Sequence, residues 1–432
     1  MSLTAISRYG ARVLPNTEQL VAGCKARGEL IQGPQIAEFE AAFARRAAMD
    51  PSHAIAASYG RMAFYDILKA LDLPRGSEIV VPALTFWVVP ELARAAGLKV
   101  VFADVDPATF TLDPSAFERA ITPNTRAVVP THLYGLPCDM DAIMATASRH
   151  NMTVIEDCAH ALGATYDGKP LGTFGDAAFF SFQTLKPLNC YGGGLALVRD
   201  RAVAARVRAL AEAEPWPDAK RIENRLLVGK LQRIFIKPWV FTISAFPILW
   251  VSSLIGANPD VYLWEKIRSL TPLPDSYTER FPNVQAVLGL AALEMLDGWT
   301  ERTRRHARVM DQALGDLPGI TVPQVPPKRT HVYYQYCVYG PQRDELVVRC
   351  VRRGIDIETL HVDVCSDMDI FANETVIPPG APGARRAAGA MQIPVYSTLT
   401  DEQAQRVARV VRDVLQRSRG LTSLRQGFGG PP

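Results

Sequence analysis

The sequence predicts an α/β protein with a large domain, built on a mainly parallel sheet flanked by helices, and a smaller C-terminal α/β domain. Three observations lead to this prediction. Apolar runs of strand length alternate with helical periods up to Leu197. A chain of 432 residues is too long for one ordinary domain. After Arg302 a second alternation of strand and helix patterns begins, and it closes with an amphipathic helix.

Four segments are expected along the chain. They are an N-terminal arm over 1–33, a large domain over 34–300 with an apolar insert at about 230–270, a small domain over 301–417 and a flexible tail over 418–432. The arm should contain a short helix from Thr17 to Arg27, and the large domain should close with a helix from Phe281 to Trp299.

Composition limits the possible functions. Hydrophobic residues make up 48% of the chain and the net charge is only +3, so a nucleic-acid partner is not expected. Seven cysteines lie scattered without a CxxC pair, which argues for a reducing compartment and against a disulfide or zinc scaffold. The first residues lack the apolar core of a signal peptide. We therefore expect a cytoplasmic protein without a metal site.

A phosphate-binding turn is a candidate near the start of the large domain. The stretch AIAASYGRMAFYDILKAL predicts a strand ending at Ser58, a turn at Gly60 and a helix from Arg61. The first N–H groups of such a helix are unpaired and its dipole favours anions. An ordinary strand-to-helix turn is the alternative.

The residues from Val154 to Leu197 carry the strongest chemical signal. An apolar run ends at Asp157, where a buried parallel strand would open into a site. A second run contains Ser181, and Lys186 follows in a loop before three glycines. A lysine and an aspartate at one sheet edge suit pyridoxal phosphate, which needs a lysine for its aldehyde and an anion for its ring nitrogen. The alternative is an exposed loop lysine and a helix-capping aspartate.

These motifs together resemble a known family. The sequence DCAH from Asp157 to His160, the Ser181-Phe pair, Lys186 five residues after the serine and the glycines beyond it are similar to the DegT/DnrJ/EryC1/StrS sugar aminotransferases. The resemblance extends from about Gly33 to about Leu415 and implies the pyridoxal-phosphate-dependent transferase fold of type I.

The resemblance implies a role for each candidate site residue. Lys186 would hold the cofactor as a Schiff base and carry a proton, and Asp157 would keep the ring nitrogen protonated. His160 would lie near the phenolic oxygen of the cofactor. The remaining roles fall to Ser181, Gly60 and Arg61 at the phosphate and to Phe86 on the ring face, with Trp87 as the alternative to Phe86. The family usually has Gly-Thr or Gly-Ser where this chain has Gly60-Arg61.

The reaction implied is transfer of an amino group, with glutamate as the expected donor, to a nucleotide-linked keto sugar. The resemblance also implies a homodimer with a shared active site. The asparagine of a family Asn-Tyr-Arg motif reaches the cofactor phosphate of the neighbouring subunit, and here that motif falls on Thr278 to Arg280. A lipid-linked keto substrate is an alternative. The dehydratase branch of the family has histidine where Lys186 stands, and a non-catalytic regulator is a further alternative.

The segment from Ile234 to Gly256 departs from the family and is almost wholly apolar. Its length would allow a membrane span, but Pro238 and Pro247 interrupt it. Tryptophans and basic residues around it suit an interfacial helix pair, the tryptophans being Trp239, Trp250 and Trp264. Three readings stay open: peripheral contact with a membrane or a lipid substrate, a buried subunit interface, and a true span.

Overall fold

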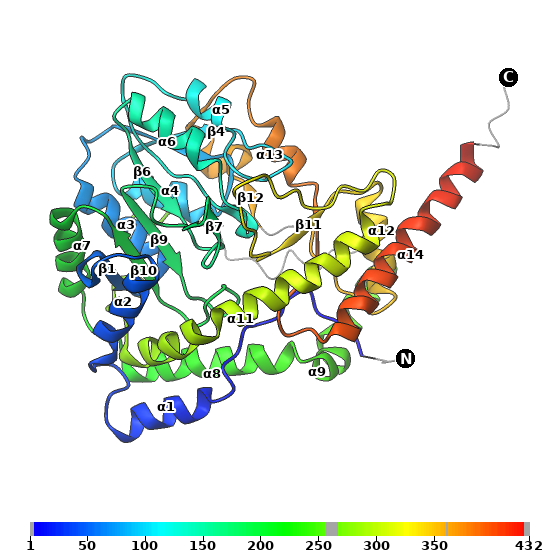
Figure 1. The fold of residues 1–432 in the computed structure, drawn as a ribbon, viewed down its shortest axis with the longest axis horizontal. Coiled ribbons are helices and arrows are strands. Elements are labelled where there is room, and N and C mark those ends of the chain that lie inside the picture. The colour runs from blue at the N-terminus through cyan, green and yellow to red at the C-terminus, as the bar shows by residue number, and fades with distance from the viewer. Residues whose placement is uncertain (1–3, 256–266, 360–361, 427–432) are drawn as a thin grey trace.

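An eight-stranded sheet forms the centre of the large domain in the computed structural model, which describes residues 4–255, 267–359 and 362–426 (Figure 1). The five strands from β9 to β4 are parallel to one another, β13 joins them in parallel, and β1 and β10 pair antiparallel at the other edge. The mainly parallel sheet predicted from the sequence is confirmed. In spatial order the strands are β1 (Ala54–Ala57), β10 (Gly194–Val198), β9 (Ala177–Ser181), β6 (Thr153–Asp157), β5 (Thr125–Val128), β2 (Glu78–Pro82), β4 (Lys99–Ala103) and β13 (Thr375–Val376).

Helices cover both faces of this sheet because its strands are apolar on both sides. Val154 and Phe180 point into one core, whereas the adjacent Ile155 and Phe179 point into the other. The first core is covered by α2 (Gln35–Arg46), α5 (Pro114–Arg119), α6 (Met140–Arg149) and α11 (Asn283–Leu314). The second is covered by α3 (Gly60–Leu71), α4 (Val88–Ala95), α7 (Arg201–Ala213) and α13 (Pro382–Ala387).

The smaller C-terminal unit has its own core around the end of α11. Its strands β11 (Tyr336–Val338) and β14 (Met391–Ile393) pair antiparallel, and α12 (Arg343–Val351) and α14 (Asp401–Gln426) pack beside them. Figure 1 shows α11 running from the large domain to α12 and α14. The helix therefore continues well past Trp299, where the sequence analysis ended it.

Two C-terminal strands return to the large domain. Strand β13 extends the main sheet beside β4, and β12 (Asp363–Val364) pairs with β3 (Leu84–Thr85) next to the predicted site. The sequence analysis did not anticipate this return. Short elements complete the fold: α1 (Thr17–Ala26), β7 (Thr165–Tyr166), β8 (Lys169–Pro170), and the 3-10 helices at Pro51–His53, Leu133–Gly135, Cys365–Asp367 and Asp369–Phe371.

The apolar insert forms three helices, α8 (Ala219–Phe235), α9 (Pro238–Ile243) and α10 (Ala245–Ile255). Pro238 opens α9, as expected for a residue without an N–H group, and Pro247 lies in the first turn of α10. Over the residues that the structure describes, no helix combines the length and the apolar character needed to cross a membrane. Gly256 and Trp264 lie outside the described residues.

The C-terminal helix α14 runs to Gln426, which is inside the segment 418–432 predicted to be a flexible tail. The last part of that segment, 427–432, lies outside the described residues. The domain boundaries at 33, 300 and 417 stay predictions.

Candidate active site

A cavity of about 650 Å³ lies at the carboxyl ends of the parallel strands. The ends of β6 and β9, the N-terminus of α3 and the loop after β9 meet there. Every residue that the sequence predicted for the site contributes to its wall: Gly60, Arg61, Phe86, Asp157, His160, Ser181 and Lys186. Trp87, the alternative to Phe86, is buried in the core instead.

Asp157 is held at the end of β6 by its backbone. Its N–H donates to the carbonyl oxygen of Pro130 and its own carbonyl accepts from the N–H of His132. The carboxylate is buried, and its Oδ1 accepts from the N–H of Ala159 at 3.0 Å. Burial raises the pKa of Asp157, whereas the Ala159 hydrogen bond and the charge of Lys186 lower it. The site therefore presents a buried carboxylate that a cationic ligand would stabilise.

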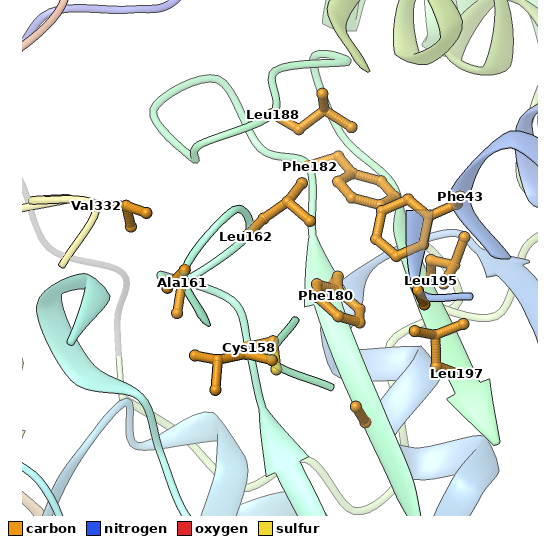
Figure 2. Close-up of a cluster of buried hydrophobic side chains, with 14 of the residues drawn as sticks. Phe43, Cys158, Ala161, Leu162, Phe180, Phe182, Leu188, Leu195, Leu197 and Val332 are labelled. Carbon is orange, nitrogen blue, oxygen red and sulfur yellow. The ribbon is translucent and has the colours of Figure 1, made fainter. Parts of the chain in front are cut away.

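Lys186 is not an exposed loop lysine, because its side chain is half-buried and lines the cavity. The core anchors its loop: the neighbouring Leu188 is fully buried, close to Phe182 (Figure 2). The ammonium lies 5.0 Å from the ring centre of Tyr334. Burial lowers the pKa of Lys186 to about 8, the attraction of Asp157 opposes this change and the charge of Arg61 adds to it. A sizeable fraction of this amine is therefore neutral and nucleophilic near pH 8.

We expect the rate of Lys186 modification by trinitrobenzenesulfonate in the cofactor-free protein, followed by mass spectrometry, to rise with pH with a midpoint near 8. Only the neutral amine reacts, and burial stabilises that form. In urea the midpoint should move to the ordinary value of 10.5. Because the unfolded chain binds more protons between these values, the contribution of this group to stability should rise with pH across the same window. A midpoint near 10.5 in the folded protein would contradict the structure.

The phosphate corner is formed by the N-terminus of α3 and the end of β9. A side chain at position 60 would bring a Cβ within 2.6 Å of the carbonyl oxygen of Phe180 and 2.9 Å of the Ser181 Cβ, so only glycine fits without displacing the strand. Arg61 donates to the Tyr277 hydroxyl, and its guanidinium lies 4.8 Å from the Tyr277 ring centre and 5.6 Å from that of Phe86. A helix N-terminus, a serine and a guanidinium thus converge at one end of the cavity.

Aromatic rings form much of the cavity wall. His160 stacks on Tyr334 with ring centres 4.1 Å apart and an interplanar angle of 19°. Phe86 is half-buried and faces the cavity. The sequence analysis missed Tyr334, Tyr277 and Tyr59, which also line the cavity. Tyr334 lies two residues before β11, and nothing in the local sequence indicates its contact with Lys186.

The N-terminal arm and the small domain close the remaining side. Arg8 donates to both carboxylate oxygens of Asp356, at 2.9 Å and 2.6 Å, and both side chains are buried. The neighbouring Tyr9 donates to Glu358, which also accepts from Gln335 at 3.1 Å. Arg8, Tyr9 and Glu358 line the cavity, but no sequence signal links residues more than 300 positions apart.

Next to the cavity, Glu156 is a structural hub. Its carboxylate accepts from the N–H groups of Gly172, Phe174 and Gly175 and contacts His132 Nε2 at 3.1 Å. The side-chain atoms of His132, Glu156 and Cys158 that could bind a metal ion lie within 4.8 Å of one another. Hydrogen bonds already occupy the histidine and the glutamate. His132, on which the sequence analysis placed no role, therefore holds the fold beneath Asp157.

We expect the Glu156→Gln substitution to lower the free energy of unfolding by about 2–4 kcal/mol, because an amide retains only one of the two buried acceptor oxygens. Thermal and urea unfolding would measure the change. Glu38→Ala on the exposed side of α2 is the control and should change stability by less than about 0.5 kcal/mol. Equal stability of the two variants would contradict a stabilising role for the Glu156 hydrogen bonds.

The site fits pyridoxal phosphate. The buried carboxylate of Asp157 and the Lys186 amine, whose pKa is lowered, line the same cavity. Beside them lies the N-terminus of α3, where only glycine fits at position 60. On a large, mainly parallel sheet with a smaller C-terminal domain, this combination defines a pyridoxal-phosphate-dependent transferase of fold type I. The cofactor and the fold class predicted from the sequence are confirmed.

The chain belongs to the DegT/DnrJ/EryC1/StrS aminotransferase family, whose sequence model matches residues 15–229 and 263–412. The resemblance drawn from the motifs is therefore confirmed, and the protein is an aminotransferase of this family. The intervening residues 230–262 are unmatched and contain the whole apolar segment from Ile234 to Gly256.

Known relatives cover most of the chain. GDP-perosamine synthase from Caulobacter vibrioides is 31% identical, over 89% of this chain and 91% of that protein. A protein named pleiotropic regulatory protein, from Geobacillus stearothermophilus, is 31% identical over 84% of each chain. The crystal structure of the aminotransferase TlmJ from Streptoalloteichus hindustanus matches with a TM-score of 0.76 and 25% identity, over 96% of this chain and 99% of that one.

Proposed function

We propose that the protein transfers an amino group from glutamate to a keto sugar carried on a nucleotide. The observation that carries this proposal is the convergence of Lys186, Asp157 and the N-terminus of α3 on one cavity. The relative named GDP-perosamine synthase supports a nucleotide-linked acceptor. When bound, pyridoxal phosphate supplies an electron sink for the reacting carbon.

Lys186 is the proposed covalent anchor and proton carrier. Its Nζ would hold the cofactor between turnovers and, when released, move a proton from the amino-bearing carbon of the substrate. The lowered pKa of Lys186 favours both tasks near pH 8, because the amine must be neutral to accept a proton. Asp157 would hold the ring nitrogen protonated, and that positive charge would offset the cost of burying the carboxylate.

The remaining residues orient the bound group. The phosphate would be bound by Ser181, by the N–H groups in the first turn of α3 from Gly60 onward and by the guanidinium of Arg61. These groups converge at one end of the cavity. Phe86 would cover one face of the ring. His160, which stacks on Tyr334, would contact the phenolic oxygen of the cofactor.

The proposed assembly is a homodimer with a shared active site, on the cytoplasmic side and peripheral to a membrane. The family resemblance supports the dimer, although Thr278 stands where the family has asparagine. Seven free, buried cysteines support a reducing compartment. Sedimentation velocity of the holoenzyme tests the dimer, and a monomer active at the same concentration would overturn it.

The experiment for the function separates donor from acceptor. Glutamate mixed with the purified holoenzyme should convert the bound cofactor to its amine form in the absence of acceptor, and a series of nucleotide-linked keto sugars should then restore the aldehyde form. Failure of the first half would favour a non-catalytic role, as the name of the Geobacillus relative suggests. Success of the first half with no active nucleotide-linked acceptor would overturn the proposed substrate.

A lipid-linked keto substrate is the second candidate. The observation that favours it is the exposed apolar surface of α8, α9 and α10, which lies largely in the segment that the family model does not match. Comparing a lipid-linked keto sugar with its nucleotide-linked counterpart in the second half-reaction would decide between the two. Higher kcat/KM for the nucleotide-linked compound in the presence of vesicles would exclude the lipid-linked one.

A further inference from the structure

The helices of the insert expose an unusual amount of apolar surface. Among the described residues, most of the exposed large apolar side chains lie between Leu227 and Leu254. Trp239 is 62% exposed, Ile243 71% and Ile248 66%. We call the following set the α8–α10 face: Leu227, Val228, Leu231, Phe235, Trp239, Ile243, Ile248, Trp250, Val251 and Leu254. Soluble proteins rarely leave so much apolar surface open unless a partner or a membrane covers it.

The opposite side of these helices is anchored to the body of the protein. Val240 and Phe241 are buried, and the N–H of Ala5 donates to Thr242 Oγ1 at 2.7 Å. Helix α10 packs against α12, where Arg352 donates to the carbonyl oxygen of Ser253 at 3.1 Å. Figure 1 shows α8 and α9 along one edge of the molecule, beside α11. The α8–α10 face therefore points outward because the helices behind it are held in place.

Along the sequence, the charged residues of this segment are all basic. Between Arg225 and Pro259 the sequence contains Arg225, Lys230, Arg233 and Lys237 and no acidic residue. Glu18 of α1 pairs with Lys230 at 2.8 Å and lies 4.0 Å from Arg233, while Lys237 is exposed. A second copy docked through the same face would offer the exposed Lys237 no acidic partner from this segment. Anionic lipid headgroups would complement the basic residues, and exposed tryptophans suit the depth of a membrane interface.

We propose that the α8–α10 face docks into the interfacial layer of an anionic lipid bilayer. The face lies largely in the segment that the family model skips, so it is an addition to the shared catalytic fold. The arm links it to the cavity, since Ala5 bonds to α9 while Arg8 and Tyr9 line the cavity wall. Docking would bring the arm side of the cavity close to the membrane, whichever acceptor the enzyme uses.

Co-sedimentation of the holoenzyme with vesicles tests this inference. The wild-type protein should sediment with phosphatidylcholine vesicles that contain phosphatidylglycerol, and more weakly with phosphatidylcholine alone. The double variant Ile243→Glu/Ile248→Glu should partition on the order of 100-fold less, because two anchoring side chains are lost from the bilayer. Lys237→Glu should bind anionic vesicles about tenfold less and neutral vesicles equally well.

Val325→Glu is the matched control, because Val325 is an exposed apolar residue of the C-terminal half, outside α8–α10. It should bind vesicles like the wild type. Glutamate-driven conversion of the cofactor should be unchanged in all variants, so that loss of docking and loss of chemistry are distinguished. The inference is overturned if the wild type stays in solution with anionic vesicles, or if the double variant binds as well as Val325→Glu. Dissociation of a homodimer by the double variant would overturn it too, by showing that a second copy covers the face.

Discussion

The Lys186→Ala variant should lose transamination by at least about a thousandfold, because it lacks both the nucleophile and the proton carrier of the proposed site. Its unfolding free energy should change little, since Leu188 and Phe182, and not the lysine, anchor the loop in the core. The measurement is steady-state transamination together with mass spectrometry after borohydride reduction. In the wild type the peptide containing Lys186 should carry the cofactor mass, and in the variant no peptide should.

Lys186→Arg is the matched control for charge. It keeps a cation near Asp157, but a guanidinium stays protonated at all working pH values and cannot act as nucleophile or base. Equal inactivity of the alanine and arginine variants would show that the neutral amine, and not the positive charge, is required. Turnover within tenfold of wild type in either variant would remove Lys186 from the proposed mechanism.

The sequence predicts those parts of the fold that depend on local patterns. The apolar run before Asp157 identifies β6, and the run containing Ser181 identifies β9, because both strands are buried on two faces. Helix α11 shows the limit of such reasoning. The sequence analysis ended this helix at Trp299, yet Thr303, His306 and Met310 continue the buried stripe to Leu314. The partner that buries this stripe is the small domain, which the local sequence does not reveal.

The candidate site divides in the same way. Lys186, Asp157 and Ser181 could be predicted because they lie in one stretch of sequence, at or just beyond the ends of two adjacent parallel strands. The Arg8–Asp356 pair joins positions 348 residues apart, and its presence depends on how the arm folds back over the small domain. For Arg61 the sequence indicated a possible phosphate ligand, and the structure adds the aromatic rings that hold its guanidinium. Wall residues contributed by distant segments thus require the tertiary fold.

The Asp157→Asn variant should retain the cofactor on Lys186 but lose about 100-fold to 10,000-fold in kcat, because a neutral amide cannot keep the ring nitrogen protonated. The substitution preserves the size of the side chain and an oxygen able to accept from the N–H of Ala159. A second readout follows from the charge. Asp157 raises the pKa of Lys186, so in the cofactor-free variant the midpoint of lysine modification should fall below its wild-type value of about 8.

Asp167→Asn is the control for this variant. Asp167 is exposed and has a φ of 49°, a conformation that asparagine tolerates, so both activity and the Lys186 midpoint should stay at wild-type values. A purely structural role for Asp157 would lower the melting temperature without moving the lysine midpoint. A midpoint that rises in Asp157→Asn, or a kcat within tenfold of wild type, would show that this carboxylate does not face the lysine across a shared cofactor site.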